Sequence, residues 1–95
     1  MKVLVTEYVC SAYYGGCDIK TYVDIPDNTK ESIKNAVVKA IFKTDESDNY
    51  EINLYEDEKI DGVYHITSVE LKCKALTGRF IGRVRLDVRG KVELI

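Results

Sequence analysis

The spacing of apolar residues changes twice along this chain of 95 residues, and these changes constrain the fold more than any other feature. Apolar and polar residues alternate up to residue 25, apolar residues recur at intervals of three and four from 33 to 41, and alternation returns from residue 50 onwards. Alternation is typical of a strand with one buried face, whereas intervals of three and four are typical of an amphipathic helix. The sequence therefore predicts strands before and after one helix.

The first alternating segment surrounds residues 10–17, Cys-Ser-Ala-Tyr-Tyr-Gly-Gly-Cys. A glycine pair between two alternating runs predicts a β-hairpin, with a loop of either two residues, 15–16, or four residues, 13–16. We expect Tyr13 and Tyr14 at the hairpin tip, where large aromatic side chains can bind a partner. The predicted core face carries Leu4, Tyr8, Cys10, Ile19, Val23 and Ile25.

The middle of the chain has the features of one helix. Asn28 is followed three residues later by Glu31, which is the spacing of a capping box. Residues 18–41 resemble the opening hairpin and helix of ubiquitin-like β-grasp domains. The second half of the chain differs from that family, because its tight hairpins favour a meander and because the chain lacks a terminal Gly-Gly. The residues expected on the buried stripe of the helix are Ile33, Ala36, Val37, Ala40 and Ile41.

Alternation after residue 50, with turns at 61–62 and 77–78, predicts an antiparallel meander of three strands. The strands are expected over residues 50–58, 63–76 and 79–89. The expected cross-strand pairs are Leu54 with Val69, Ile52 with Leu71, Leu71 with Val84, and Ala75 with Phe80.

The predicted fold class is therefore α+β. Residues 1–95 form a single small domain, ββαβββ, with one amphipathic helix packed on a mostly antiparallel sheet of a hairpin plus a C-terminal meander. The order in which the hairpin and the meander join stays open. One arrangement sets the C-terminal strand beside the first strand, which gives a continuous sheet.

The net charge of −2 conceals two oppositely charged parts. Residues 1–70 carry seven basic and 14 acidic residues, whereas residues 71–95 carry seven basic and two acidic residues. Such polarity indicates either a charged partner or two parts that face each other. No apolar stretch reaches the length of a membrane span or of a signal-peptide core, so we expect a cytoplasmic protein whose cysteines are thiols.

Three cysteines and one histidine are the ligand types of some structural zinc sites. However, His65 and Cys73 are separated by about 26 Å on one predicted strand, at about 3.3 Å per residue, which is too far for one ion or for a nucleophile and its base. Residues 45–56 resemble a calcium-binding EF-hand loop, but Tyr50 stands where the sharp turn requires Gly. We therefore expect residues 45–56 to be a solvated acidic loop that leads into a strand. For the chain as a whole we expect no metal, no cofactor and no catalytic pair.

The outer face of the predicted meander interleaves basic residues with Tyr and Ile. Such a surface fits a protein interface, where Tyr and Arg are enriched, a nucleic-acid site, where basic groups contact phosphates and rings stack on bases, or a plain solvated face without a partner. Glu70 opposite Arg85, Glu51 opposite Lys72 and an isoelectric point near 5.4 weigh against nucleic acid. The candidate binding residues are Tyr55, Tyr64, Lys72, Lys74, Ile81, Arg83, Arg85 and Arg89, together with Tyr13 and Tyr14; Ile66 is expected on the same outer face.

These features predict a small cytoplasmic interaction protein without catalytic activity, of the regulator or inhibitor type that mobile elements encode. It would bind a protein partner, not a membrane, through the outer face and the hairpin tip. The alternative is a nucleic-acid-binding protein that uses the basic face, and a third hypothesis is an enzyme or a small-ligand or metal-binding domain that uses cysteine and His65. Residues 90–95 can form an exposed edge strand that joins a second copy in a homodimer.

Overall fold

In the described part of the chain, strands and one α-helix follow one another in the predicted order, with one strand more than expected. The computed structural model of the protein describes residues 1–11 and 15–95. The prediction of an α+β fold with one helix on an antiparallel sheet is confirmed. The elements are β1 (Lys2–Ser11), β2 (Gly15–Asp24), α1 (Lys30–Phe42), the short 3-10 helix η1 (Ser47–Asn49), β3 (Tyr50–Glu56), β4 (Val63–Lys74), β5 (Phe80–Leu86) and β6 (Gly90–Leu94).

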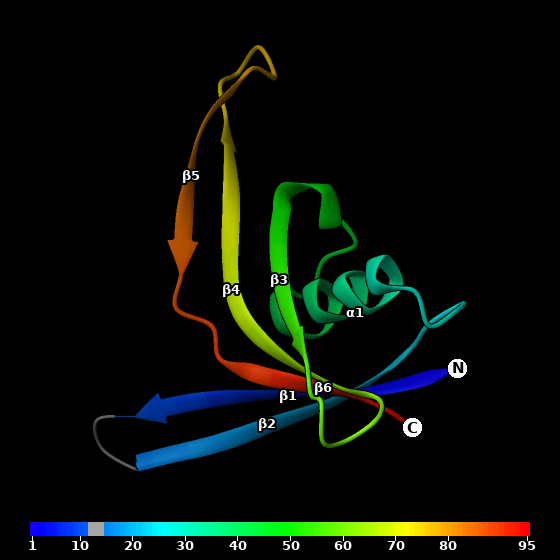
Figure 1. Ribbon diagram of the computed structural model, residues 1–95. Helices are drawn as coiled ribbons and strands as arrows, with labels where there is room; N and C mark the ends of the chain where they lie inside the picture. The colour runs from blue at the N-terminus through cyan, green and yellow to red at the C-terminus, as the bar shows by residue number, and fades with distance from the viewer. Residues whose placement is uncertain (12–14) are drawn as a thin grey trace.

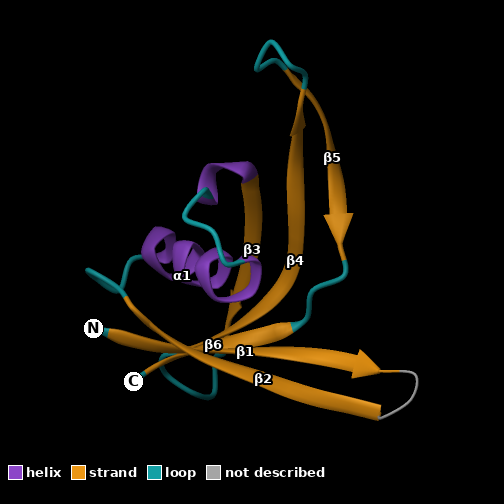
Figure 2. Ribbon diagram, turned by 180° about the vertical axis from the view of Figure 1, so that it is seen from behind, coloured by secondary structure: helices purple, strands orange, loops and turns teal. Residues whose placement is uncertain are grey.

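The strands form one antiparallel sheet in the order β2-β1-β6-β4-β3, and β5 pairs with β4 outside this order. β4 changes partner along its length, because residues 63–66 pair with β6 and residues 69–74 pair with β5. The sheet therefore divides into two hairpins, β1–β2 and β4–β5, which point in different directions (Figure 1). α1 covers one face of the sheet and contacts β1, β2 and β3 (Figure 2).

β6 lies in the middle of the sheet, where it joins the two hairpins. It pairs with β1 on one side and with β4 on the other, and Val92 is completely buried. The sheet is continuous and its last strand lies beside β1, but that strand is β6 and not the expected last strand of the meander, residues 79–89. The prediction that residues 90–95 form an exposed edge strand is wrong, because both edges of β6 are occupied within the chain. The homodimer that we expected through this edge therefore cannot form.

The face that β1 presents to the core is opposite to the predicted one. Val3 and Val5 belong to the core, whereas Leu4 and Tyr8 alternate with them and lie on the other face. The prediction for Leu4 and Tyr8 is therefore wrong. On the second strand and just after it, Val23 and Ile25 are buried as predicted, and Ile19 is exposed.

The register of the β1–β2 hairpin explains this difference. Ser11 pairs with Gly15, so three residues separate the two strands, in place of the two or four that we expected. A change of one residue in the register moves the whole strand to the opposite face of the sheet. The side chain of Cys10 lies outside the described part of the structure, as do Tyr13 and Tyr14.

α1 begins one residue later than expected. Thr29 is its N-cap, because the Thr29 Oγ1 atom accepts a hydrogen bond from the Ser32 amide. The hydroxyls of Thr29 and Ser32 each donate a hydrogen bond to the Asp27 carboxylate. The predicted capping box of Asn28 and Glu31 is therefore wrong. The buried stripe of α1 is confirmed and consists of Ile33, Ala36, Val37, Val38 and Ala40, with Ile41 partly buried.

No helix in residues 1–11 and 15–95 is long and apolar enough to cross a bilayer.

β4 contains a β-bulge where it changes partner. Asn53 pairs with Ser68 but the next residue, Leu54, pairs with Ile66, so Thr67 is an extra residue in β4. The Thr67 hydroxyl donates a hydrogen bond to the Asn53 carbonyl oxygen at 3.0 Å. A bulge bends its strand and changes which residues face the core on its two sides.

The bulge moves two predicted surface residues into the core. Tyr64 and Ile66 are 9% and 8% exposed, so their predicted position on the outer face is wrong. The expected pairing of Leu54 with Val69 is also wrong, because Val69 pairs with Ile52. Strict alternation along β4 would have kept Tyr64 on the solvent side, and one extra residue reverses that assignment.

The β4–β5 hairpin keeps the predicted register in its middle, where Leu71 pairs with Val84. Nearer the turn, Phe80 pairs with Lys74 and not with the residue after it, because Ile81 is extra in β5. The predicted strand 79–89 ends at Leu86, and residues 87–89 lead into β6.

We expect the Gly90→Ala variant to be less stable than the parent protein by about 2 kcal/mol or more, since overpacking costs roughly 1–3 kcal/mol even where side chains can move. A Cβ atom on Gly90 would lie 2.1 Å from the backbone oxygen of Thr6, and backbone atoms cannot rotate away. Urea unfolding followed by circular dichroism measures the difference.

The control for this prediction is Gly82→Ala, because no atom of the described residues, apart from its chain neighbours, lies within 4 Å of a Cβ placed on Gly82. We expect its stability to stay within about 1 kcal/mol of the parent. Equal unfolding midpoints for the two variants would show that the close contact between β6 and β1 is not needed.

Candidate functional site

The outer half of the β4–β5 hairpin, residues 71–86, is strongly basic, and we call it the basic arm. It contains five basic residues and no acidic residue. α1 contacts β1, β2 and β3, so the basic arm extends beyond the region that α1 covers (Figure 1). The basic residues of the arm are Lys72, which is half-buried, and Lys74, Arg79, Arg83 and Arg85, which are exposed.

Arg83 is fixed on the outer face of the arm, which is the face away from α1. Its Nη1 atom forms an ion pair with Glu51 and lies 3.4 Å from Glu70 Oε2. Its guanidinium carbon lies 5.6 Å from the centre of the Phe80 ring, which is within the range of a cation–π contact. Two carboxylates and one aromatic ring therefore hold this side chain against the sheet.

Arg85 has no such partner. It lies opposite Glu70 in the sheet, as predicted, but Glu70 contacts Arg83, and the described residues contain no ion pair of Arg85. Glu51 lies opposite Glu70 and not opposite Lys72, so that part of the expected neutralisation is wrong. The two carboxylates compensate one arginine, and the charge of Arg85 remains accessible to a partner.

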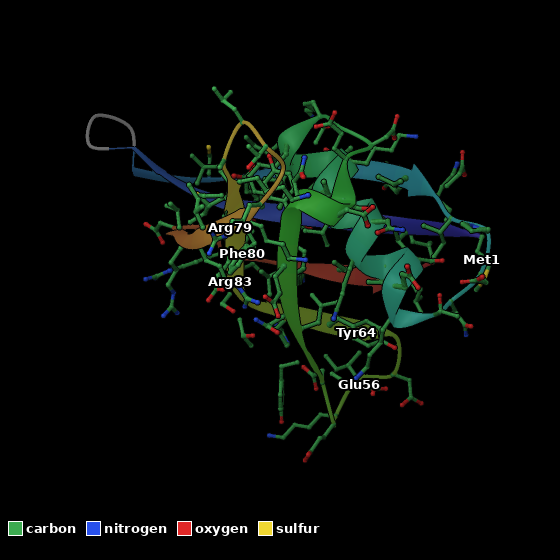
Figure 3. All side chains as sticks on the ribbon, turned by 90° about the horizontal axis from the view of Figure 1, so that it is seen from above. Met1, Glu56, Tyr64, Arg79, Phe80 and Arg83 are labelled. Atoms are coloured by element: carbon green, nitrogen blue, oxygen red, sulfur yellow. The ribbon has the colours of Figure 1, made fainter. Side chains whose placement is uncertain are left out.

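Large apolar side chains are exposed beside these charges. Leu76 at the turn extends fully into solvent, and Phe80 and Val84 are each about half exposed, although the strand alternation predicted both in the core. The predicted exposure of Ile81 is confirmed. Figure 3 looks down on the tip of the hairpin and labels Arg79, Phe80 and Arg83, and the Arg83 guanidinium lies beside the Phe80 ring. The arm thus combines apolar surface with positive charge.

The other predicted binding residues do not join the basic arm. Tyr55 is exposed on β3, and Arg89 is exposed in the segment between β5 and β6. Tyr64 is buried in the core. Tyr13 and Tyr14 lie outside the described residues. The predicted site is therefore divided, and five of its members, Lys72, Lys74, Ile81, Arg83 and Arg85, lie on the arm.

Four residues of this surface were not among the predicted binding residues. One signal was available, because residues 71–86 contain no Asp or Glu, and this run includes Arg79. The exposure of Phe80 and Val84 had no signal, since alternation identifies a face of a strand and not what covers that face. The missed residues are Leu76, Arg79, Phe80 and Val84.

Two clefts lie at the base of the arm, where β5 leads into β6. The first has a volume of about 510 Å³ and is lined by residues 66–68 and 85–89. The second is lined by residues 7–9 together with Asp87 and Arg89. The Tyr8 amide donates a hydrogen bond to the Arg89 carbonyl at 2.8 Å, which ties the connecting segment to β1. The first cleft therefore lies between β4 and the segment that links β5 to β6, and the second lies between that segment and β1.

His65, on β4, forms a hydrogen bond with Asp57 in the turn between β3 and β4. Its Nε2 atom lies 3.0 Å from Asp57 Oδ2, and Asp57 Oδ1 accepts hydrogen bonds from the Lys59 and Ile60 amides. The hydrogen bond with His65 and the amide of Lys59 hold the pKa of Asp57 below its ordinary value of 3.8. Across the described chain, no three His, Cys, Asp or Glu side chains are grouped as metal ligands.

Comparison with known proteins does not identify a relative. No protein-family model matches the chain, and neither the curated proteins nor the solved structures contain a significant match. The function proposed below therefore depends on the geometry and charge of this chain alone.

We expect acid to remove a stabilising contribution of Asp57. Because its pKa is lowered by folding, this contribution is complete above the unfolded pKa and is lost as pH falls through the folded pKa. The free energy of unfolding of the parent protein should exceed that of Asp57→Asn near neutral pH, and the difference should shrink as pH falls below about 4. Urea unfolding at a series of pH values measures it.

Asp61→Asn is the matched control, because Asp61 lies in the same turn and no hydrogen bond to its side chain is found among the described residues. Its stability should follow the parent protein at every pH. A constant difference between parent and Asp57→Asn from neutral pH to about pH 3 would contradict the assigned role of Asp57.

Proposed function

We propose that the protein is a non-catalytic interaction protein, and that it binds an acidic surface of a partner protein through the basic arm. One observation carries the proposal: residues 71–86 hold five basic and no acidic residues on a hairpin that extends beyond the helix-covered core. A concentrated positive field on an exposed element favours association with negatively charged surfaces.

The apolar side chains of the arm favour a protein partner. Arg and aromatic residues are enriched at protein interfaces, and exposed aromatic or aliphatic groups supply the area that a partner buries. Phe80, Ile81 and Val84 provide such area next to Arg83 and Arg85. A small cytoplasmic regulator or inhibitor, of the kind that mobile elements encode, would work in this way, since it acts by occupying the surface of another protein.

We expect the double variant Arg79→Glu/Arg85→Glu to lose the partner. Neither side chain has an ion pair within the described structure, so the reversal changes the surface and leaves the core intact. Proteins captured from the native host by a crosslinkable form of the chain are identified by mass spectrometry, and the affinity of the purified partner is then measured by calorimetry. The variant should bind at least about tenfold more weakly.

The matched control is Lys20→Glu/Lys30→Glu, which changes the net charge equally at two exposed positions outside the arm. It should bind the same purified partner with the affinity of the parent protein. If both double variants lose the partner equally, net charge is responsible and not the basic arm. If neither loses it, the partner binds elsewhere and the proposal is wrong.

A second candidate function, binding of single-stranded nucleic acid, is supported by the contact of Arg83 with the exposed Phe80 ring. Aromatic rings beside basic groups form stacking platforms for bases. Fluorescence anisotropy of labelled single-stranded and double-stranded oligonucleotides tests this function. Binding should weaken steeply with salt, and Phe80→Ala should reduce binding of the single strand more than binding of the duplex. No binding at low salt would exclude this second candidate.

A further inference from the structure

β5 is an edge strand whose second edge is open. It pairs with β4 alone, and within residues 1–11 and 15–95 the one further backbone hydrogen bond of its residues is a local one, in which the Leu86 carbonyl accepts from the Val88 amide at 3.1 Å. Its residues are exposed for most of their length. An open edge presents a row of free N–H and C=O groups, which an additional strand can satisfy.

Two other strands, β2 and β3, also lie at an edge of the sheet, but they are less suited to accept a partner. The core side of β3 is already covered, as Ile52 is 2% exposed, so a strand added there would bury little further apolar surface. β2 carries charges of both signs, Asp18, Lys20 and Asp24, which do not specify a partner of either sign. β5 differs from both strands on these two points.

The two faces of β5 have distinct chemistry. Arg83 and Arg85 lie on the outer face, whereas Val84 and Leu86 lie on the inner face, which α1 leaves uncovered at this distance from the core. Val84 is 49% exposed, and Leu86 is partly buried. A strand beside β5 would therefore meet positive charge on one face and apolar surface on the other.

The bulge at Ile81 limits the usable edge. Bulges interrupt regular pairing and twist the strand, so an added strand pairs regularly only with residues 82–86. These residues span about 16 Å at roughly 3.3 Å per residue. Gly82 has no side chain to obstruct the approach, and the cleft at the base of the arm continues past Leu86.

We propose that residues 82–86 of β5 accept an extended segment of the partner protein as an additional strand, and that this segment alternates acidic with apolar residues. Its acidic residues lie beside Arg83 and Arg85, and its apolar residues cover Val84 and Leu86. Arg85 gains a new ion pair with such an acidic residue, whereas Arg83 already forms one with Glu51. This inference rests on the proposed function, in which the basic arm binds an acidic protein surface.

The test uses three capped synthetic peptides as probes. The first contains Val-Glu-Val-Glu-Val between short Gly-Ser flanks, the second replaces Glu by Lys, and the third is the Glu peptide with all five central amides N-methylated, so that neither edge can donate. N-methylation leaves the charge unchanged but removes the donors that strand addition needs. Amide NMR shifts and hydrogen exchange of the whole chain report where each probe binds.

The expected result is that the Glu peptide shifts and protects amides of residues 82–86, whereas the Lys peptide and the N-methylated peptide bind at least about tenfold more weakly. Arg85→Glu should reverse the preference between the Glu and Lys peptides. Lys30→Glu carries the same charge change at an exposed position on α1, outside the basic arm, and should keep the preference of the parent protein.

Three results would overturn the inference. The first is equal binding of the N-methylated peptide, which means attraction by charge alone. The second is that no peptide changes the amide NMR shifts of residues 82–86. The third is that a single-stranded oligonucleotide changes these shifts and the Glu peptide does not. If the peptides fail but Arg79→Glu/Arg85→Glu still loses the purified partner, strand addition is wrong and the proposed function stands. If that variant keeps the partner, the proposed function itself is wrong.

Discussion

The insertion of β6 between β1 and β4 is the constraint on which the rest of the structure depends. Without it the described chain would consist of the β1–β2 hairpin and the meander of β3, β4 and β5, joined through the contacts of α1 with β1, β2 and β3. The insertion requires a very close approach of two backbones, since the space beside Gly90 is taken by the backbone oxygen of Thr6. A residue without Cβ is therefore needed at this point of the strand. β6 is short, and its first residue, Gly90, lies beside residue 66 of β4. The outer part of β4 therefore pairs with β5 alone on that side.

Local sequence signals predicted those parts of the fold that depend on local spacing. The helix stripe and the pairing of Leu71 with Val84 were both correct, because each depends on residues near in sequence. The faces of β1 were wrong, because a single residue in loop length reverses a strand and the sequence does not specify the loop length. Thr67 had the same effect on β4, and nothing in its neighbours distinguishes a bulge from regular strand.

The candidate site was predictable in charge but not in shape. Lys72, Arg83 and Arg85 could be named from alternation on β4 and β5, and the acid-free run that contains them is visible in the sequence. The exposure of Val84 depends on how far α1 reaches across the sheet, which is a property of tertiary packing. The burial of Tyr64 has the same kind of origin, because it follows from the bulge and from pairing with Val92.

The change of partner along β4 also divides this strand into a part where substitutions affect the core and a part where they affect mainly the surface. Residues 63–66 are part of the core, where a change of volume affects the whole domain, whereas the arm contributes little to that core. Substitutions in the arm can therefore accumulate without loss of the fold, as in the loops of other domains that carry recognition. Under the proposed function, substitutions confined to this single hairpin would change the partner, while the sheet and helix that support the hairpin stay the same.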